Sequence, residues 1–171
     1  MASTASTTSS TSRRSSSPLT RYYLAAYNAI SFTLWATCTV RGVALLSLSA
    51  LSAPAGADKL PDIFNAVYSP FLTTTQSLAL LEILHSLLGI VRAPVTTTAM
   101  QVASRIFLVW GVMYPFRGSI VGDGKETKLG NLAFLGCLAA WGVTECIRYG
   151  FFALQVLGVH VPSWWMWLRL I

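Results

Sequence analysis

Four long apolar stretches, separated by short polar segments, dominate the chain. They cover residues 22–40, 71–91, 95–114 and 129–157, and a run of small residues after Arg41 could extend the first of them. About 20 helical residues are needed to cross the apolar core of a bilayer, so each stretch is long enough to span it as a helix. The pattern therefore predicts an all-α, multi-pass transmembrane helix bundle.

A fifth apolar segment, residues 161–171, is too short to cross a bilayer alone. Its 11 residues would form about 16 Å of helix. Trp164, Trp165 and Trp167 suit the headgroup region, where amphipathic aromatic rings are favoured. We therefore expect four full spans and the beginning of a fifth.

Composition favours a membrane protein over a soluble domain. Hydrophobic residues make up 54% of the 171 residues and charged residues only 11%, against roughly 25% in typical soluble domains. The 12 Lys and Arg residues outnumber the 6 Asp and Glu residues but form no basic block, which argues against a nucleic-acid partner and for a lipid bilayer.

Arg13, Arg14 and Arg21 favour a cytosolic N-terminus, although the basic residues of the loop 117–128 would then face the other side.

The first 17 residues are nearly all Ser, Thr and Ala, with Arg13 and Arg14 among them. They lack the apolar side chains needed for a core, so we expect a disordered tail over residues 1–20 and a transmembrane domain over residues 21–171. The tail also lacks the apolar region of a cleaved secretory signal. Two roles remain open: a solvated cytosolic tail that could be phosphorylated, which we favour, and an organelle transit peptide of similar acid-free composition.

Three cysteines, Cys38, Cys137 and Cys146, lie within the apolar stretches. None belongs to a Cys-x-x-Cys pair or has a histidine at ligand spacing, so the sequence indicates neither a disulfide framework nor a metal site. We expect all three to be small buried hydrophobic residues.

Polar side chains inside the apolar stretches are the most informative positions. A charged side chain at the centre of a membrane helix costs at least about 2.5–3.5 kcal/mol, so such groups normally face a bundle interior, a partner or a site. Helical spacing of three or four places each set on one helix face. The sets are Glu82 and His85, Gln101 and Arg105, and Glu145, Arg148 and Tyr149. Two roles remain open for them: ion pairs that fix helix register, or a polar pocket for a substrate head group.

One apparent motif does not support an activity. The segment from His85 to Arg92 has the spacing of the tyrosine phosphatase signature His-Cys-x5-Arg, but Ser86 replaces the nucleophilic cysteine. The residues between are mostly apolar and offer no solvated loop for phosphate. We therefore expect no phosphatase activity.

Three runs of sequence resemble a known family. They are YLAAYNAISFTLW (23–35), LEILHSLLGIVRAPVTTTAMQVASRIFLVWGV (81–112) and WGVTECIRYGFF (141–152). The elements LEI-x-H-x3-GIV, QV-x-SRIF-x-VW and W-x-VTE-x-x-RY are similar, in the same order, to those of the 3-hydroxyacyl-CoA dehydratases of very-long-chain fatty acid elongation. This family is also called the protein tyrosine phosphatase-like proteins, and the resemblance covers most of residues 21–171.

The resemblance implies a lyase of the endoplasmic reticulum membrane. Such an enzyme removes water from a (3R)-3-hydroxyacyl-CoA and forms a trans-2-enoyl-CoA, the third step of the elongation cycle. A base takes the proton next to the thioester and an acid protonates the departing hydroxyl, so neither a metal nor another cofactor is expected. The implied partners are a long-chain acyl-CoA and the other enzymes of the cycle.

The sequence departs from the family at its catalytic pair. In the family a Tyr and a Glu lie in a Tyr-Pro-x-Gly-x4-Glu-like motif, which does not occur in residues 1–171. Trp167–Arg169 is similar to the stretch just before that motif, so the pair is expected beyond Ile171. We therefore assign no catalytic residue and place only Arg169 next to the chemistry. The residues assigned to the pocket wall or scaffold are Glu82, His85, Gln101, Arg105, Glu145, Arg148 and Tyr149.

Two other functions were weighed against the dehydratase. A chain without the catalytic pair is expected to show no turnover by itself, and it could instead act as a non-catalytic membrane scaffold for the elongation enzymes. A small transporter would need a polar path open to both sides. The sequence shows neither paired broken helices nor inverted repeats, which argues against transport.

Overall fold

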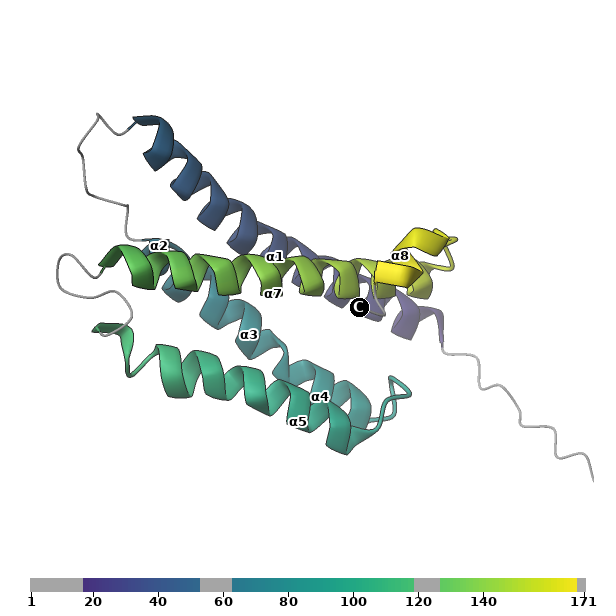
Figure 1. Cartoon of the computed structure of the whole chain (residues 1–171). Helices are drawn as coiled ribbons and strands as arrows, with labels where there is room; N and C mark the ends of the chain where they lie inside the picture. The colour runs from purple at the N-terminus through teal and green to yellow at the C-terminus, as the bar shows by residue number, and fades with distance from the viewer. Residues whose placement is uncertain (1–16, 53–62, 119–126, 169–171) are drawn as a thin grey trace, which may run out of the picture.

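The computed structural model describes residues 17–52, 63–118 and 127–168, and all regular structure within these ranges is helical (Figure 1). The predicted all-α class is confirmed, since the described ranges contain no β-strand. The elements are the helices α1 (Pro18–Ser52), α2 (Ile63–Val67), α3 (Thr73–Leu78), α4 (Leu80–Leu87), α5 (Val95–Ile106), α7 (Thr127–Leu157) and α8 (Ser163–Leu168), and the π-helical segments η1 (Tyr68–Leu72) and η2 (Phe107–Met113).

These elements form four long rods. α1 and α7 are single helices, whereas α2, η1, α3 and α4 follow one another almost without interruption, and α5 continues into η2. α1 and α7 pack side by side, the α2–α4 rod lies against them, and the α5–η2 rod packs on α3 and α4 (Figure 1). Two stretches, Pro18–Leu48 and Gly130–Leu157, are uninterrupted helices long and apolar enough to cross a membrane.

The second rod begins at Ile63, not at Phe71, where the predicted stretch begins. Asn65, Ser69 and Pro70 interrupt the apolar pattern just before Phe71 and concealed this part of the helix. Pro70 lies within η1. Because proline lacks the N–H group that a regular α-helix uses, a π-helical turn at this point accommodates it without ending the rod.

The same rod ends earlier than predicted, at Leu87 instead of Val91. Gly89 has a φ of 68°, in the left-handed region that favours glycine and that ends helices. Pro94 precedes the first residue of α5 and has an extended backbone. α5 therefore begins at Val95, as the sequence predicts.

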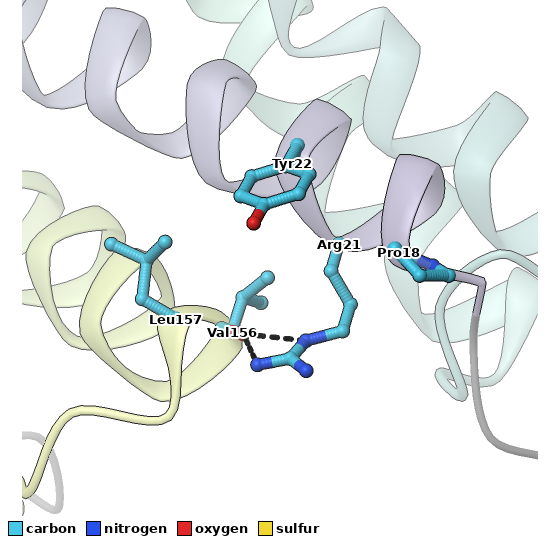
Figure 2. A pocket seen from close by; sticks show the side chains of 5 residues that line it. All are labelled: Pro18, Arg21, Tyr22, Val156 and Leu157. Atoms are coloured by element: carbon cyan, nitrogen blue, oxygen red, sulfur yellow. Dashed lines mark hydrogen bonds between the residues drawn. The ribbon is translucent and has the colours of Figure 1, made fainter.

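Three helix ends meet near the start of α1. Arg21 donates from Nε and Nη2 to the carbonyl oxygen of Val156, near the end of α7, with both distances 3.2 Å (Figure 2). The hydroxyl of Tyr23 lies 2.8 Å from Nε2 of His85, near the end of α4. α1 thus runs antiparallel to both α4 and α7 at this end of the bundle.

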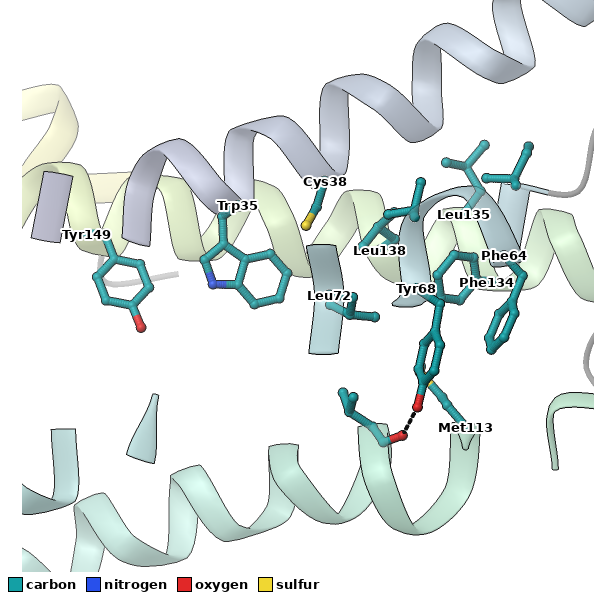
Figure 3. Close-up of a cluster of buried hydrophobic side chains, with 13 residues drawn as sticks. Trp35, Cys38, Phe64, Tyr68, Leu72, Met113, Phe134, Leu135, Leu138 and Tyr149 are labelled. Atoms are coloured by element: carbon teal, nitrogen blue, oxygen red, sulfur yellow. Dashed lines mark hydrogen bonds between the residues drawn. The ribbon is translucent and has the colours of Figure 1, made fainter. Parts of the chain in front are cut away.

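A cluster of buried apolar side chains fills the other half of the bundle, where α2 meets α7 (Figure 3). Phe64 stacks on Tyr68 with ring centroids 4.6 Å apart and meets Phe134 of α7 edge-on at 4.8 Å. Trp35 of α1 extends this core toward the centre of the molecule and lies 5.3 Å from Trp141. Burial of these large rings stabilises the contact between the rods.

The cysteines differ in burial. Cys38 is fully buried in the core and Cys146 is partly buried, whereas Cys137 is exposed. The prediction that all three are buried is therefore wrong for Cys137. Cys137 lies to one side of the α7 face that carries Phe134 and Leu138, which pack into the core.

Small residues bring α1 and α7 close together. A Cβ atom added to Gly142 of α7 would lie 1.8 Å from Oγ1 of Thr39 on α1, and one added to Gly42 of α1 would lie 2.9 Å from a methyl group of Leu135. Close approach through glycine is a common way for membrane helices to pack. The α1–α7 contact therefore depends on the missing side chain at Gly142.

α8 folds back on α7. Nε1 of Trp165 donates to the carbonyl oxygen of Ile147 at 3.0 Å, and its ring covers Gly150. Trp164 and Trp167 are exposed, and their predicted place at a membrane surface stays a prediction. Whether α8 begins a fifth span stays a prediction.

Replacing Tyr68 by phenylalanine is expected to lower the free energy of unfolding by about 1 kcal/mol. The buried Tyr68 hydroxyl donates to the carbonyl oxygen of Val109 at 2.6 Å and joins η1 to η2. Unfolding in detergent micelles, followed by circular dichroism, measures the loss. Tyr114→Phe, at an exposed tyrosine of the same rod as Val109, is the matched control and should change stability by less than about 0.5 kcal/mol. Equal stability of the two variants would show that the Tyr68 hydrogen bond contributes nothing.

Candidate functional site

Polar side chains from four helices meet inside the bundle, nearer the end where α1 begins. α4, α5 and α7 supply what we call the polar cluster: Glu82, His85, Arg105, Glu145, Arg148 and Tyr149. α1 adds two tyrosines beside it. The sequence predicted that the acids and bases on these helices would offset one another, and the structure brings them into contact.

Arg148 is the centre of the polar cluster. Its Nη1 and Nη2 donate to the two carboxylate oxygens of Glu82, at 3.0 and 2.8 Å. Its Nε donates to Oε2 of Glu145, one turn earlier on α7, at 2.8 Å. A guanidinium that binds a carboxylate through two parallel bonds makes a strong and directional ion pair. Arg148 therefore joins α4 to α7 in one relative position.

Glu145 connects a third helix. Its Oε1 lies 2.8 Å from Nη1 of Arg105 on α5, while its other oxygen accepts from Arg148. The side chain of Glu145 is 4% exposed, and those of Arg105, Arg148 and Glu82 are 23%, 26% and 16% exposed. Two acids and two bases make the cluster electrically neutral. Removal of one member would leave a buried charge without its partner, which is costly.

Tyr149 adds a proton donor to the cluster. Its hydroxyl donates to Oε1 of Glu82, and its ring lies under the guanidinium of Arg148, 4.2 Å from the ring centroid. Tyr149 is almost fully buried. Glu82 thus accepts from both a guanidinium and a phenol, and all its bonds are made within the chain.

His85 lies in an aromatic pocket formed by α1. Tyr23 bonds its Nε2, and the ring of Tyr27 meets the imidazole edge-on at 4.8 Å. The Tyr27 hydroxyl donates to the carbonyl oxygen of Leu78 at 3.2 Å, and its ring also faces Tyr149 at 6.3 Å. Tyr27 therefore connects His85 to the ionic part of the cluster.

Sequence reasoning did not identify Tyr23 and Tyr27 as site residues. The nearest charged residue, Arg21, belongs to the flank of the predicted span, so both tyrosines looked like ordinary residues of an apolar helix. Their spacing of four places them on one face of α1 and was the signal that could have identified them.

One predicted site residue, Gln101, lies apart from the polar cluster. Gln101 is four residues from Arg105, but its side chain is exposed. The long side chain of Arg105 reaches α7, whereas the structure does not bring Gln101 to these partners. Arg169 lies outside the described residues.

The segment from His85 to Arg92, which has phosphatase-like spacing, forms the end of α4 and part of the turn that follows it. The Ser86 hydroxyl donates to the carbonyl oxygen of Ala93 at 2.7 Å and closes the turn between α4 and α5. Arg92 is exposed within that turn. His85, at the other end of the segment, is bound by Tyr23 instead of facing a phosphate loop.

The chemistry available in the polar cluster is that of acids and bases. The Tyr149–Glu82 pair joins a proton donor to a proton acceptor in an apolar setting, and each is already bonded to the other. Within the described ranges, no group of three or more His, Cys, Asp or Glu residues is placed to hold a metal ion. The arrangement therefore holds helices together and can line a polar pocket.

Comparison with known proteins identifies relatives for most of the chain. The model of the family "Protein tyrosine phosphatase-like protein, PTPLA" matches residues 76–170, which include the whole polar cluster. The very-long-chain (3R)-3-hydroxyacyl-CoA dehydratase PASTICCINO 2 of Arabidopsis thaliana is 35% identical over 149 residues, 87% of this chain and 59% of the relative. A probable very-long-chain (3R)-3-hydroxyacyl-CoA dehydratase of Schizosaccharomyces pombe is 35% identical over 147 residues, 86% of this chain and 62% of the relative.

A human relative is more distant. Very-long-chain (3R)-3-hydroxyacyl-CoA dehydratase 2 of Homo sapiens is 31% identical over 152 residues, 89% of this chain and 52% of the relative. The chain thus spans little more than half the length of the curated relatives it matches. No solved structure matches it.

Proposed function

The chain belongs to the protein tyrosine phosphatase-like family, PTPLA, and from this membership we propose that it serves the dehydration of very-long-chain (3R)-3-hydroxyacyl-CoA to trans-2-enoyl-CoA. This reaction is the third step of the fatty acid elongation cycle, and it makes the protein a hydro-lyase. The observation that carries the proposal is the 35% identity with dehydratases of a plant and a yeast across more than four fifths of the chain.

The proposed reaction needs only proton transfer. A base removes the proton next to the thioester, and an acid protonates the hydroxyl as it leaves. The substrate is neither oxidised nor reduced, so we propose that no metal or organic cofactor takes part. The polar cluster serves this chemistry as pocket wall and scaffold, because its ionic groups satisfy one another. Gln101 and Arg169 are proposed to line the substrate path, with Arg169 next to the reacting atoms.

We propose a four-span bundle in the endoplasmic reticulum membrane with a cytosolic N-terminus. Each predicted apolar stretch is part of a helical rod, and successive rods run in alternating directions. A bundle interior suits a very long acyl chain, which would lie among apolar helices while its reactive end reaches the polar cluster. The other enzymes of the elongation cycle are the proposed partners.

A membrane assay for the enoyl product tests the proposal. The chain is produced in membranes in two forms, one of residues 1–171 and one continued after Ile171 by the C-terminal part of the Arabidopsis relative. Conversion of a very-long-chain 3-hydroxyacyl-CoA is followed by mass spectrometry. We expect turnover by the continued form and none by the shorter form, which lacks the family's catalytic motif. A continued form that folds but is inactive, where the Arabidopsis enzyme is active, would refute the proposal.

A non-catalytic scaffold for the elongation enzymes is the second candidate. The observation that favours it is that Glu82 and Glu145 are both fully engaged by arginines and a tyrosine of the same chain. Purification from membranes distinguishes the two functions. Retention of a condensing enzyme or a reductase, with no enoyl product from either form, would support the scaffold.

A further inference from the structure

The second and third rods each contain a π-helical segment, and these two segments are bonded to each other. η1 covers Tyr68–Leu72 and η2 covers Phe107–Met113, and the Tyr68 hydroxyl donates to the carbonyl oxygen of Val109 at 2.6 Å. Pro70 lies within η1 and lacks the N–H group that a regular helix uses. Helices bend at proline and at π-helical turns, so both rods can bend at the same level of the bundle.

The packing of these rods on α1 and α7 changes beyond the π-helical segments. α2 packs closely on both α1 and α7, and η1 and α3 pack on α1. The close packing of α4 and α5 is with each other, with α3 and with η2. Figure 1 shows α4 and α5 diverging from α7 toward the end of the bundle where α1 begins. We call residues 73–106, which form α3, α4, α5 and the turn before α5, the hairpin.

Bonds within the hairpin hold α4 and α5 together. The Ser86 hydroxyl donates to the carbonyl oxygen of Ala93 at 2.7 Å, across the turn between the two helices. The N–H group of Ile90 donates to the carbonyl oxygen of His85 at 2.9 Å. The hairpin is therefore built to move as one body.

Long polar side chains join the free end of the hairpin to α1 and α7, where close packing of helix on helix gives way to side-chain bonds. We call these bonds the latch. They are the bonds of Glu82 with Arg148 and Tyr149, of Arg105 with Glu145, and of His85 with Tyr23.

The charges of the latch are divided so that its two halves can separate. The hairpin carries one acid and one base, Glu82 and Arg105, and α7 carries one of each, Glu145 and Arg148. Nε of Arg148 also donates to Glu145 at 2.8 Å, so α7 keeps a bonded pair when the hairpin moves away. Neither side is left with a net charge, which limits the cost of separation.

We infer that the hairpin is a gate that turns about η1 and η2, with the polar cluster as its latch. Hinges of this kind absorb a rotation within a few residues. Opening widens the space between α5 and α7 and frees the Glu82 carboxylate, which is bonded within the chain when the gate is closed. Leu87 lies 15 residues beyond Leu72, the last residue of η1. This is about 22 Å along the helices, so a rotation of about 10° moves the end of α4 by about 4 Å.

The gate goes beyond the proposed function, because it concerns how the interior opens, whichever ligand enters. Distances between pairs of nitroxide labels test it on the full chain in nanodiscs, with the three native cysteines replaced by alanine. Labels at Leu87 and Leu157, both exposed, report on the free end of the hairpin. The double variant Glu82→Gln and Arg105→Gln removes the charges of the hairpin and leaves the bonded pair on α7. Pulsed electron paramagnetic resonance should show the distance between these labels lengthened by about 4 Å.

Two further label pairs locate the pivot. Phe116 and Leu132 lie near the opposite end of the bundle, and Leu84 and Met100 lie on α4 and α5; all four are exposed. The double variant should change neither distance. The first pair lies beyond the pivot, and the second lies within the body that moves.

Arg92→Gln is the matched control, since Arg92 is an exposed arginine in the turn of the same hairpin. It should leave all three distances unchanged. Circular dichroism measures the helix content of each variant. Where the double variant loses helix content, Arg105→Gln alone takes its place; it releases α5 but not α4, so it should give a smaller lengthening.

Three results would overturn the gate. The first is an unchanged distance between the labels at Leu87 and Leu157 in a variant that keeps its helix content. The second is an equal lengthening between Phe116 and Leu132, since the rods would then separate along their whole length. The third is a lengthening within the hairpin itself, which would mean that α4 and α5 come apart.

Discussion

Arg148→Met is expected to lower the free energy of unfolding by about 3–5 kcal/mol, the cost of breaking a buried ion pair by removing one partner. Arg148 donates to both oxygens of Glu82 and to Glu145, and methionine fills a similar volume without any donor. Glu82 would keep only the Tyr149 hydroxyl as a partner. Unfolding in detergent micelles, measured by circular dichroism, gives the difference from the unaltered chain.

Two further variants show whether the effect comes from charge pairing. Arg117→Met changes the same residue type at an exposed position and should cost less than about 0.5 kcal/mol. Adding Glu82→Gln to Arg148→Met removes the carboxylate that lost its partner and should recover part of the stability. If Arg148→Met and Arg117→Met were equally stable, the ion pairs would not hold the bundle together.

Gly142→Ala is expected to destabilise the bundle by about 1–3 kcal/mol, as overpacking of a tight contact does. The new Cβ would lie 1.8 Å from Oγ1 of Thr39 and 3.1 Å from its Cβ. Because the Cβ of Thr39 is itself this close, relief of the clash requires a change of the Thr39 rotamer together with a small separation of the two helices. The same unfolding measurement records the loss.

Gly136→Ala is the matched control on the same helix. A Cβ at Gly136 would meet nothing within 4 Å, so this change should stabilise α7 by up to about 1 kcal/mol because alanine favours helix. Thr39→Ala combined with Gly142→Ala should recover much of the loss by removing the obstructing hydroxyl. A Gly142→Ala variant as stable as Gly136→Ala would mean that α1 and α7 adjust without cost.

The helices could be predicted from the sequence because each rod has a long apolar stretch. The start of the second rod could not, because Asn65, Ser69 and Pro70 look like a loop until Ile63 and Phe64 are seen buried against α1 and α7. The composition of a short segment does not predict a helix when contacts with neighbouring helices accommodate its polar residues. The early end at Leu87 likewise depends on the backbone of Gly89.

The sequence predicted which residues of the candidate site share a face of the same helix. Spacing placed Glu145 and Arg148 on one face of α7, and the structure shows them bonded. Which acid meets which base on another helix depends on how the rods pack, so the pairing of Arg148 with Glu82, and of Arg105 with Glu145, was not available from spacing. The spacing of residues along one helix does not predict which residue of another helix each of them contacts.

The antiparallel pairing of α1 with α7 has a consequence for biosynthesis. Arg21 and Val156 are bonded although they are 135 residues apart in the chain, and the two helices that contain them pack along much of their length. A ribosome completes α1 long before it makes its main partner, while α2 to α5 are still to come. Contacts between such distant segments form late. α1 therefore lacks its main partner until α7 has been made, and the order of synthesis differs from the order of assembly.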